Sequence, residues 1–168
     1  PVHFFTGNHD MWVKDYLSTE CGIKIHTAPL TTIIDGKKFH LAHGEGLGTR
    51  DKSYKVLLWI FRNKTLRAMY SFLHPSIGVG IGLRWSLNLR LGKGITKEFL
   101  GEDKEDLIRY AKSVLKNEEI DYFIFGHRHL AISYKLNETS EIVFLGDWIG
   151  DGSFAVWDGK SLVFNVLS

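Results

Sequence analysis

Three short segments of the sequence carry metal-binding side chains next to glycine, each directly after an apolar run. They are Gly7-Asn8-His9-Asp10, His43-Gly44 and Gly126-His127-Arg128-His129. The amide oxygen of Asn8 and the imidazole nitrogens of His43, His127 and His129 suit Mn, Fe, Zn or Ni. In open α/β sheets ligands gather beyond the strand ends, so the three segments together favour a metal or phosphate site.

The geometry of the third segment strengthens this interpretation. Within an extended strand His127 and His129 would point to opposite faces, because side chains alternate along a strand. In a loop after a buried strand and Gly126, both imidazoles can turn toward one point. The alternative is that each histidine is an ordinary surface or core residue, which is the commoner case for a histidine taken singly.

The candidate ligands lack a carboxylate that could bridge two metal ions. Two-metal hydrolytic sites, with ions roughly 3.5–4 Å apart, normally need anionic ligands to hold both charges together. Asp10 and Asp147 are the acids nearest to such a role, and the sequence pattern gives neither a convincing position.

The elements that must position these segments are strands, a helical stretch and a closing β-meander. Helical periodicity is expected near 12–20, from Tyr54 to about Leu91 with interruptions at Pro75 and at the glycines 78, 80 and 82, and over 99–117. Apolar or alternating runs predict strands, with Asp35-Gly36 as a hairpin turn, over 2–5, 23–26, 31–34, 37–42, 121–125, 131–136, 141–145, 154–157 and 162–166. This order predicts an α/β sandwich.

Composition sets the broad class. A chain of 168 residues, 44% hydrophobic, suits one globular domain, and its single cysteine makes a reducing, cytoplasmic setting the expectation. The net charge of +2 hides an asymmetry, since 50–97 contains ten Lys or Arg and one acid, for +9, and the remainder carries −7. Such a basic segment predicts an anionic partner: nucleic acid, a phosphate ester or an anionic membrane.

Taken together and in this order, the three segments resemble the second half of the signature of the calcineurin-like metallophosphoesterases. The resemblance implies an αββα sandwich with two divalent metal ions, most often Mn²⁺. It implies that Asn8, His43 and His127 bind the second ion and His129 the first, and that His9 sits beside the scissile phosphate. The Asp-x-His and Gly-Asp-x-x-Asp segments that open the signature are absent, and the chain starts at Pro1 inside a strand. We therefore expect the N-terminal strands and the bridging aspartate to lie upstream of residue 1.

Three stretches, Thr6–Trp12, the Gly-rich loop 43–48 and Phe125–Leu130, are similar to the UDP-2,3-diacylglucosamine diphosphatases of lipid A synthesis. One difference is Glu45, which stands where relatives usually carry Asp. That family inserts a helical lid within its single domain, here at about 49–97. The resemblance implies hydrolysis to UMP and 2,3-diacylglucosamine 1-phosphate at the inner leaflet of the inner membrane, by a peripheral cytoplasmic protein with no nucleic-acid partner. The residues expected to bind substrate are Asp51, Arg84, Arg90, Lys93 and Arg128.

Two other functions stay open from the sequence. The chain could be another metallophosphoesterase, acting on nucleotides or phosphoproteins, or a scaffold of the same fold that has lost its metals. The apolar residues of 49–97 could equally be a core stripe and its basic residues a solvated face. With at most four ligands, the chain alone is expected to bind Mn²⁺ weakly or at one site and to show no turnover.

Overall fold

The computed structural model describes residues 1–8, 10, 13, 15–48, 59–61, 63–92, 98–150 and 152–167. Two compact units make up the chain. One consists of residues 1–50 together with 98–168, and the other of residues 51–97.

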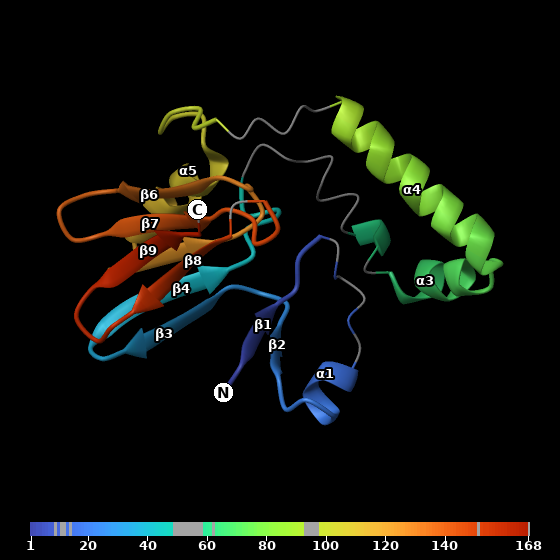
Figure 1. Cartoon of the computed structure of the whole chain (residues 1–168), viewed down its shortest axis with the longest axis horizontal. Coiled ribbons are helices and arrows are strands. Elements are labelled where there is room, and N and C mark those ends of the chain that lie inside the picture. Colours follow the sequence, from blue (N-terminus) through green and yellow to red (C-terminus); the bar gives the residue numbers. More distant parts are fainter. Residues whose placement is uncertain are drawn as a thin grey trace. The chain divides into compact units, whose positions relative to one another are not determined.

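The first unit is built on a mixed five-stranded sheet (Figure 1). At its centre, the parallel strands β4 (Lys37–Ala42), β5 (Tyr122–Phe125) and β7 (Glu141–Leu145) lie side by side. At its edges, β3 (Leu30–Ile34) pairs antiparallel with β4, and β6 (Ala131–Lys135) pairs antiparallel with β7. The predicted α/β class is thereby confirmed.

Two smaller strand pairs complete this unit. The parallel pair joins β1 (His3–Phe5) to β2 (Lys24–His26), and the short helix α1 (Tyr16–Thr19) precedes β2. The antiparallel pair is β8 (Ser153–Trp157) with β9 (Leu162–Val166). All nine predicted strands are present, and their bounds differ from the expected ones by one residue or less at each end.

The core lies between the central strands and the helix α5 (Asp106–Leu115). Phe123 and Phe125 of β5 alternate inward, as the pleat requires, and are fully buried. They pack with Leu107, Ile108 and Ala111 of α5, where Ala111 stands four and three positions after the other two, at helical spacing. The helix begins later than the predicted residue 99 because Glu105 has an extended backbone and serves as its N-cap.

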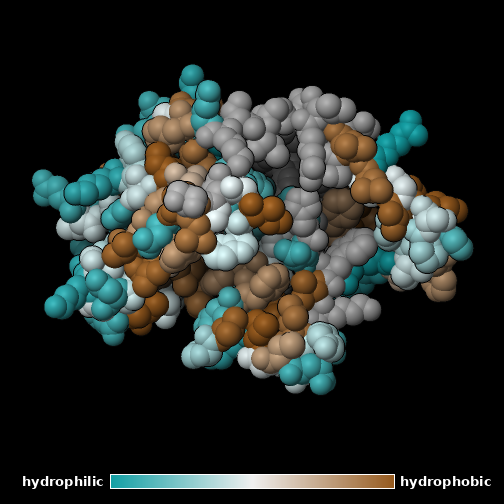
Figure 2. Space-filling view, viewed as in Figure 1, coloured by the Kyte–Doolittle hydropathy of each residue, from teal (hydrophilic) through white to brown (hydrophobic). Residues whose placement is uncertain are grey.

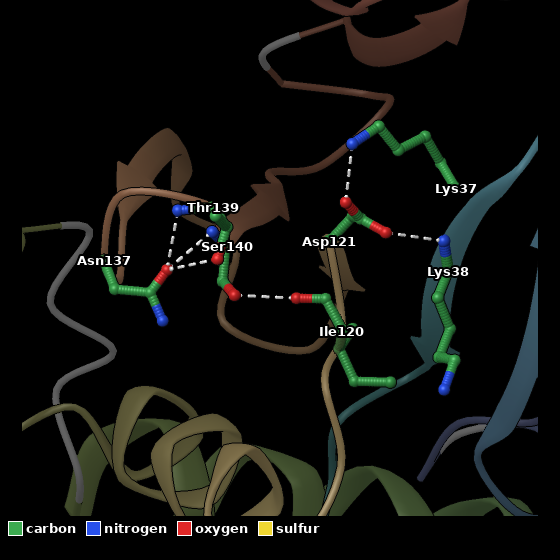
Figure 3. Close-up of polar contacts among 7 residues, drawn as sticks. All are labelled: Lys37, Lys38, Ile120, Asp121, Asn137, Thr139 and Ser140. Carbon is green, nitrogen blue, oxygen red and sulfur yellow. Dashed lines mark hydrogen bonds and ion pairs between the residues drawn. The ribbon is translucent and has the colours of Figure 1, made fainter.

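Polar contacts fix the register at the amino ends of the parallel strands (Figure 3). The carboxylate of Asp121, just before β5, accepts hydrogen bonds from Lys37 Nζ at 2.7 Å and from the Lys38 backbone N–H at 2.8 Å. Ser140, just before β7, donates its hydroxyl to the Ile120 carbonyl at 2.7 Å. Because these contacts tie β4, β5 and β7 at one end, they also align the carboxyl ends of the same strands.

The β3–β4 hairpin turns as predicted, with Asp35 and Gly36 both at positive φ, 49° and 80°. The Asp35 carboxylate accepts a hydrogen bond from Trp157 Nε1 at 2.8 Å. The Trp157 ring meets Phe39 edge-on, with centroids 5.3 Å apart. The hairpin of β8 and β9 is thereby attached to the sheet.

The unit formed by 51–97 contains the helices α3 (Lys64–Ser71) and α4 (Pro75–Gly92). The predicted interruption at Pro75 is confirmed, because α3 ends before it and α4 begins at it. The predicted interruption at the glycines 78, 80 and 82 is wrong, because α4 is continuous through them. Proline suits the first turn of a helix, where its missing N–H costs no hydrogen bond. The buried Gly78 also contacts Tyr70 of α3, whose hydroxyl donates to the Gly78 carbonyl at 2.5 Å.

Many large apolar side chains of this unit are exposed, and Figure 2 shows apolar surface over α4. The exposed set comprises Trp59, Ile60, Leu66, Met69, Phe72, Leu73, Ile77, Val79, Ile81, Leu83 and Leu87. Of the helices in the described part of the chain, none combines the length and the hydropathy needed to cross a bilayer.

Candidate functional site

The predicted metal-binding segments follow the carboxyl ends of adjacent parallel strands. Ala42, the last residue of β4, pairs with Phe125, the last residue of β5. His43 and the Gly126–His129 loop therefore leave the sheet side by side, at the edge where α/β proteins bind ligands. The prediction that these segments meet at one sheet edge is confirmed for the second and third of them.

His43 and His127 lie next to each other at this edge. Their ring centroids are 5.5 Å apart, and the ring planes make an angle of 63°. Gly126 adjoins the His43 ring, since a β-carbon there would be in van der Waals contact with His43 Nδ1, at 3.4 Å. His127 itself has a left-handed backbone, with φ of 59°. The loop thus places its first imidazole beside the histidine of the neighbouring strand.

The loop after β1 reaches the same place through Gly7. A β-carbon built on Gly7 would lie 2.7 Å from both Cε1 and Nε2 of His43, so the imidazole lies directly against this backbone. The preceding Thr6 donates its backbone N–H to the His26 carbonyl at 3.0 Å, which continues the β1–β2 pairing. The half-buried Asn8 directly follows Gly7, the residue that lies against the His43 ring.

His129 lies near a carboxylate that the sequence pattern did not place. Its Nδ1 is 3.7 Å from Oδ2 of Asp147, which follows β7 after Gly146. The backbone N–H of Gly150 donates to Asp147 Oδ1. The signal for Asp147 was available, because it stands after an apolar strand and a glycine, as Asn8 and His127 do.

The guanidinium of Arg128 is held by protein groups. Its Nε donates to Glu105 Oε2 at 3.0 Å, and its Nη2 donates to Glu105 Oε1 at 2.9 Å. Nη2 also donates to the backbone carbonyl of Glu98 at 3.0 Å. These contacts connect Arg128 to Glu98 and Glu105 of the protein itself. That Arg128 binds the substrate stays a prediction.

The remaining predicted residues fall outside this edge or outside the described chain. Arg84 is an exposed residue of α4, and Arg90 belongs to the same helix, where only its backbone is described. His9, Asp51 and Lys93 lie outside the described residues.

His40, which lies within β4, belongs to the core. Nδ1 of His40 is 2.8 Å from Thr31 Oγ1, and its Nε2 is 3.1 Å from the Tyr110 hydroxyl. Burial lowers the pKa of His40, although the charge of Glu118 opposes the shift. Both ring nitrogens thus have hydroxyl partners inside the fold, and burial disfavours the charged form of this imidazole.

The donor set fits a divalent transition metal in kind. Asn8, His43, His127 and His129 offer an amide oxygen and imidazole nitrogens, which suit Mn, Fe, Zn or Ni. Among the described residues, no three or more His, Cys, Asp or Glu side chains are grouped closely enough to hold an ion. That the two neighbouring imidazoles of His43 and His127 bind a metal ion stays a prediction.

Similarity to a bacterial hydrolase shows which family the chain belongs to. Over 99% of its length this chain is 39% identical to the UDP-2,3-diacylglucosamine hydrolase of Porphyromonas gingivalis, of which it covers 68%. The chain belongs to the UDP-2,3-diacylglucosamine hydrolase family.

More distant members of this hydrolase family agree. The chain is 24% identical to the hydrolase of Shewanella pealeana and 26% identical to that of Vibrio atlanticus. It covers 68% and 66% of those two proteins. No model of a protein family matches the chain. The UDP-2,3-diacylglucosamine hydrolases are enzymes. The sheet edge that carries His43 and the loop Gly126–His129, which we call the histidine edge, is therefore the candidate active site.

Proposed function

We propose that the protein hydrolyses the diphosphate of UDP-2,3-diacylglucosamine to UMP and 2,3-diacylglucosamine 1-phosphate, a step of lipid A synthesis. One water is consumed: its oxygen bonds to one phosphorus, the P–O–P linkage breaks, and two phosphate monoesters leave. The observation that carries the proposal is the meeting of Gly7, His43 and His127 at one sheet edge. Membership of the UDP-2,3-diacylglucosamine hydrolase family supports hydrolysis of this substrate.

In this proposal two divalent ions, Mn²⁺ by preference, bind at the histidine edge. Asn8, His43 and His127 would hold one ion, and His129 the other. Bound divalent ions would neutralise phosphoryl oxygens and lower the pKa of a coordinated water. His9 would donate a hydrogen bond to the phosphoryl group as its charge develops. Because these donors are neutral, the ions need further carboxylate ligands, and Asp147 is a candidate from its place beside His129.

The unit formed by 51–97 is proposed to bind the lipid and the diphosphate as a lid. Its exposed apolar side chains would cover acyl chains, since exposed apolar surface of this extent marks interaction sites. Arg84, Arg90 and Lys93, with Asp51, would contact the charged and sugar parts of the substrate.

The same unit is proposed to rest on the inner leaflet of the inner membrane. Its net charge of +8, from nine Lys or Arg and one acid, would attract anionic lipid head groups. Its exposed Met69 and Phe72 would enter the interface between head groups and acyl chains. The protein would then act as a peripheral protein on a substrate that itself resides in the membrane.

An assay on two substrates tests the function. Protein expressed from its complete gene is incubated with UDP-2,3-diacylglucosamine or with bis-p-nitrophenyl phosphate, in Mn²⁺ and after chelation. We expect release of UMP from the lipid, loss of this activity on chelation, and poor turnover of the small ester. Good turnover of the small ester without turnover of the lipid would instead indicate a general phosphodiesterase. The absence of both activities, together with absent Mn²⁺ binding, would indicate a metal-free scaffold.

A further inference from the structure

The loop that carries His127 and His129 has an unfavourable backbone. Both histidines are left-handed, with φ of 59° and 49°. For residues other than glycine this conformation brings the β-carbon close to a carbonyl oxygen. It persists only where the surrounding structure holds it. Between the two histidines, the Arg128 N–H donates to the Gly126 carbonyl at 2.6 Å, which makes the turn tight.

Arg128 of this loop forms an ion pair with Glu105. The two residues form two parallel charge-assisted hydrogen bonds, at 3.0 and 2.9 Å. The Glu105 side chain is only 3% exposed and that of Arg128 18%, so the pair is largely screened from water. A two-point contact of this kind fixes the direction of the guanidinium and, through it, the backbone between the two histidines.

Glu105 is itself well anchored. It is the N-cap residue of α5. Two positions further along the chain, Leu107 belongs to the hydrophobic core. Leu107 also supports the His43 loop, because its Cδ1 would lie 3.1 Å from a β-carbon on Gly44. The start of α5 therefore holds both histidine loops, one by apolar contact and one by the ion pair.

The same pair reaches the segment that follows the unit of 51–97. Arg128 donates to the carbonyl of Glu98, and the Leu100 N–H donates to Glu105 Oε1 at 3.2 Å. Residues 98–100 are thus tied to the ion pair as well. Glu98 and Glu105, which accept these hydrogen bonds from the Arg128 guanidinium, both belong to the stretch 98–105.

We propose that Glu105 is a positioning residue of the metal centre, which acts through Arg128 to hold the imidazoles of His127 and His129 in place for the ions. This inference rests on the metal centre of the proposed function, and it assigns a role to Glu105 that the sequence pattern did not suggest. Arg128 then serves the loop, and it is not required to contact the substrate.

The test uses Glu105→Gln and Arg128→Lys, each made in protein from the complete gene. Glu105→Gln keeps the shape of the side chain and removes its charge, and Arg128→Lys keeps the charge and removes the two-point contact. The matched control is Asp121→Asn, which breaks the pair with Lys37 at the opposite end of β5. Mn²⁺ affinity is measured by calorimetry, well below the lowest unfolding temperature of the set. The imidazole ¹⁵N signals of the metal-free proteins provide a second readout.

We expect Glu105→Gln and Arg128→Lys each to weaken Mn²⁺ binding by about tenfold or more, as loss of outer-shell partners of metal ligands does. The double variant should be little worse than either single one, because both remove one interaction. The signals of His127 and His129 should shift in both variants and not in Asp121→Asn. Turnover should fall through kcat, with KM nearly unchanged.

Mn²⁺ affinity of Glu105→Gln equal to that of the control would overturn the proposal. So would an increase of KM in Arg128→Lys that Glu105→Gln does not share, since Arg128 would then contact the substrate. If Glu105→Gln does not fold, Glu105→Asp, which is too short for the two-point contact, takes its place with the same expectations. Mn²⁺ binding that depends on Glu105 without lipid hydrolysis would overturn the proposed function alone. An unmodified protein that binds no Mn²⁺ would overturn both.

Discussion

The imidazole of His43 lies against the α-carbon of Gly7, at a distance that leaves no room for a side chain. A β-carbon there would be 2.7 Å from two atoms of the ring. Real β-carbons do not approach other atoms so closely. In any variant that places a side chain at position 7, either the His43 ring or the loop after β1 therefore has to move. The contact joins β1 and β4, which belong to different sheets.

Gly7→Ala is therefore expected to displace the His43 ring and to weaken Mn²⁺ binding by about tenfold or more, because ligand placement within roughly 0.5 Å is needed at such sites. Calorimetric titration of the metal measures the effect. Gly80→Ala is the control, since a β-carbon on Gly80 meets no atom within 4 Å. Equal Mn²⁺ affinity in the two variants would show that His43 is not a ligand.

Asp147→Asn tests the carboxylate beside His129. A carboxylate next to one ring nitrogen of a metal-binding histidine orients the ring, and its loss typically costs about 10–100-fold in metal affinity. Because Asn keeps an oxygen for the Gly150 N–H, the loop conformation should survive. Calorimetry with Mn²⁺ measures the loss, and Asp158→Asn, in the β8–β9 turn, should retain full affinity. Unchanged affinity in Asp147→Asn would exclude this role.

The strands could be predicted from the sequence, and the long-range contacts between side chains could not. Continuous apolar runs predicted β5 and β7 to within one residue, because a buried strand leaves a clear local pattern. The shared sheet edge of His43 and His127 followed from the general rule for α/β sheets. The pairing of Arg128 with Glu105 depends on packing 23 positions apart in the chain, which no local pattern encodes.

Two local predictions failed or fell short for identifiable reasons. The glycines of α4 resembled a helix break, but one of them, Gly78, lies against Tyr70 of α3 within an uninterrupted helix. Asp147 was considered as a metal-binding acid but was given no convincing position, although it follows an apolar strand and a glycine. The parallel pairing of β7 with β5 brings its end to the histidine edge, and this neighbourhood is a property of the sheet order.

His40 makes the stability depend on pH. Burial lowers the pKa of its imidazole, so the unfolded chain binds a proton more readily than the folded one. The free energy of unfolding should therefore fall as the pH drops through about 6.5, the value of an unburied histidine, and level off below the lower folded-state pKa. Urea unfolding between pH 7.5 and 5.0 measures this slope.

In His40→Gln that part of the slope should disappear, while the amide can still bond with Thr31 or Tyr110. The stability at pH 7.5 will be lower in the variant, because the packing against Phe123 and Phe125 changes. The comparison therefore rests on the change between two pH values. An identical pH slope in both proteins would contradict the neutral, buried state of His40.

Phe72→Ser tests membrane binding by the unit of 51–97. The Phe72 side chain is 89% exposed just after α3, and transfer of such a ring into an apolar phase is worth about 1.5–3 kcal/mol. Its loss should reduce binding to vesicles of phosphatidylethanolamine and phosphatidylglycerol by about tenfold or more in a sedimentation assay. Ile33→Ser removes a comparably exposed apolar side chain from β3 in the other unit, and should leave vesicle binding unchanged. Because the charge of 50–97 is +9, binding should also weaken as salt is raised. Equal losses in the two variants would show that the apolar surface of α3 and α4 does not determine where the protein meets the membrane.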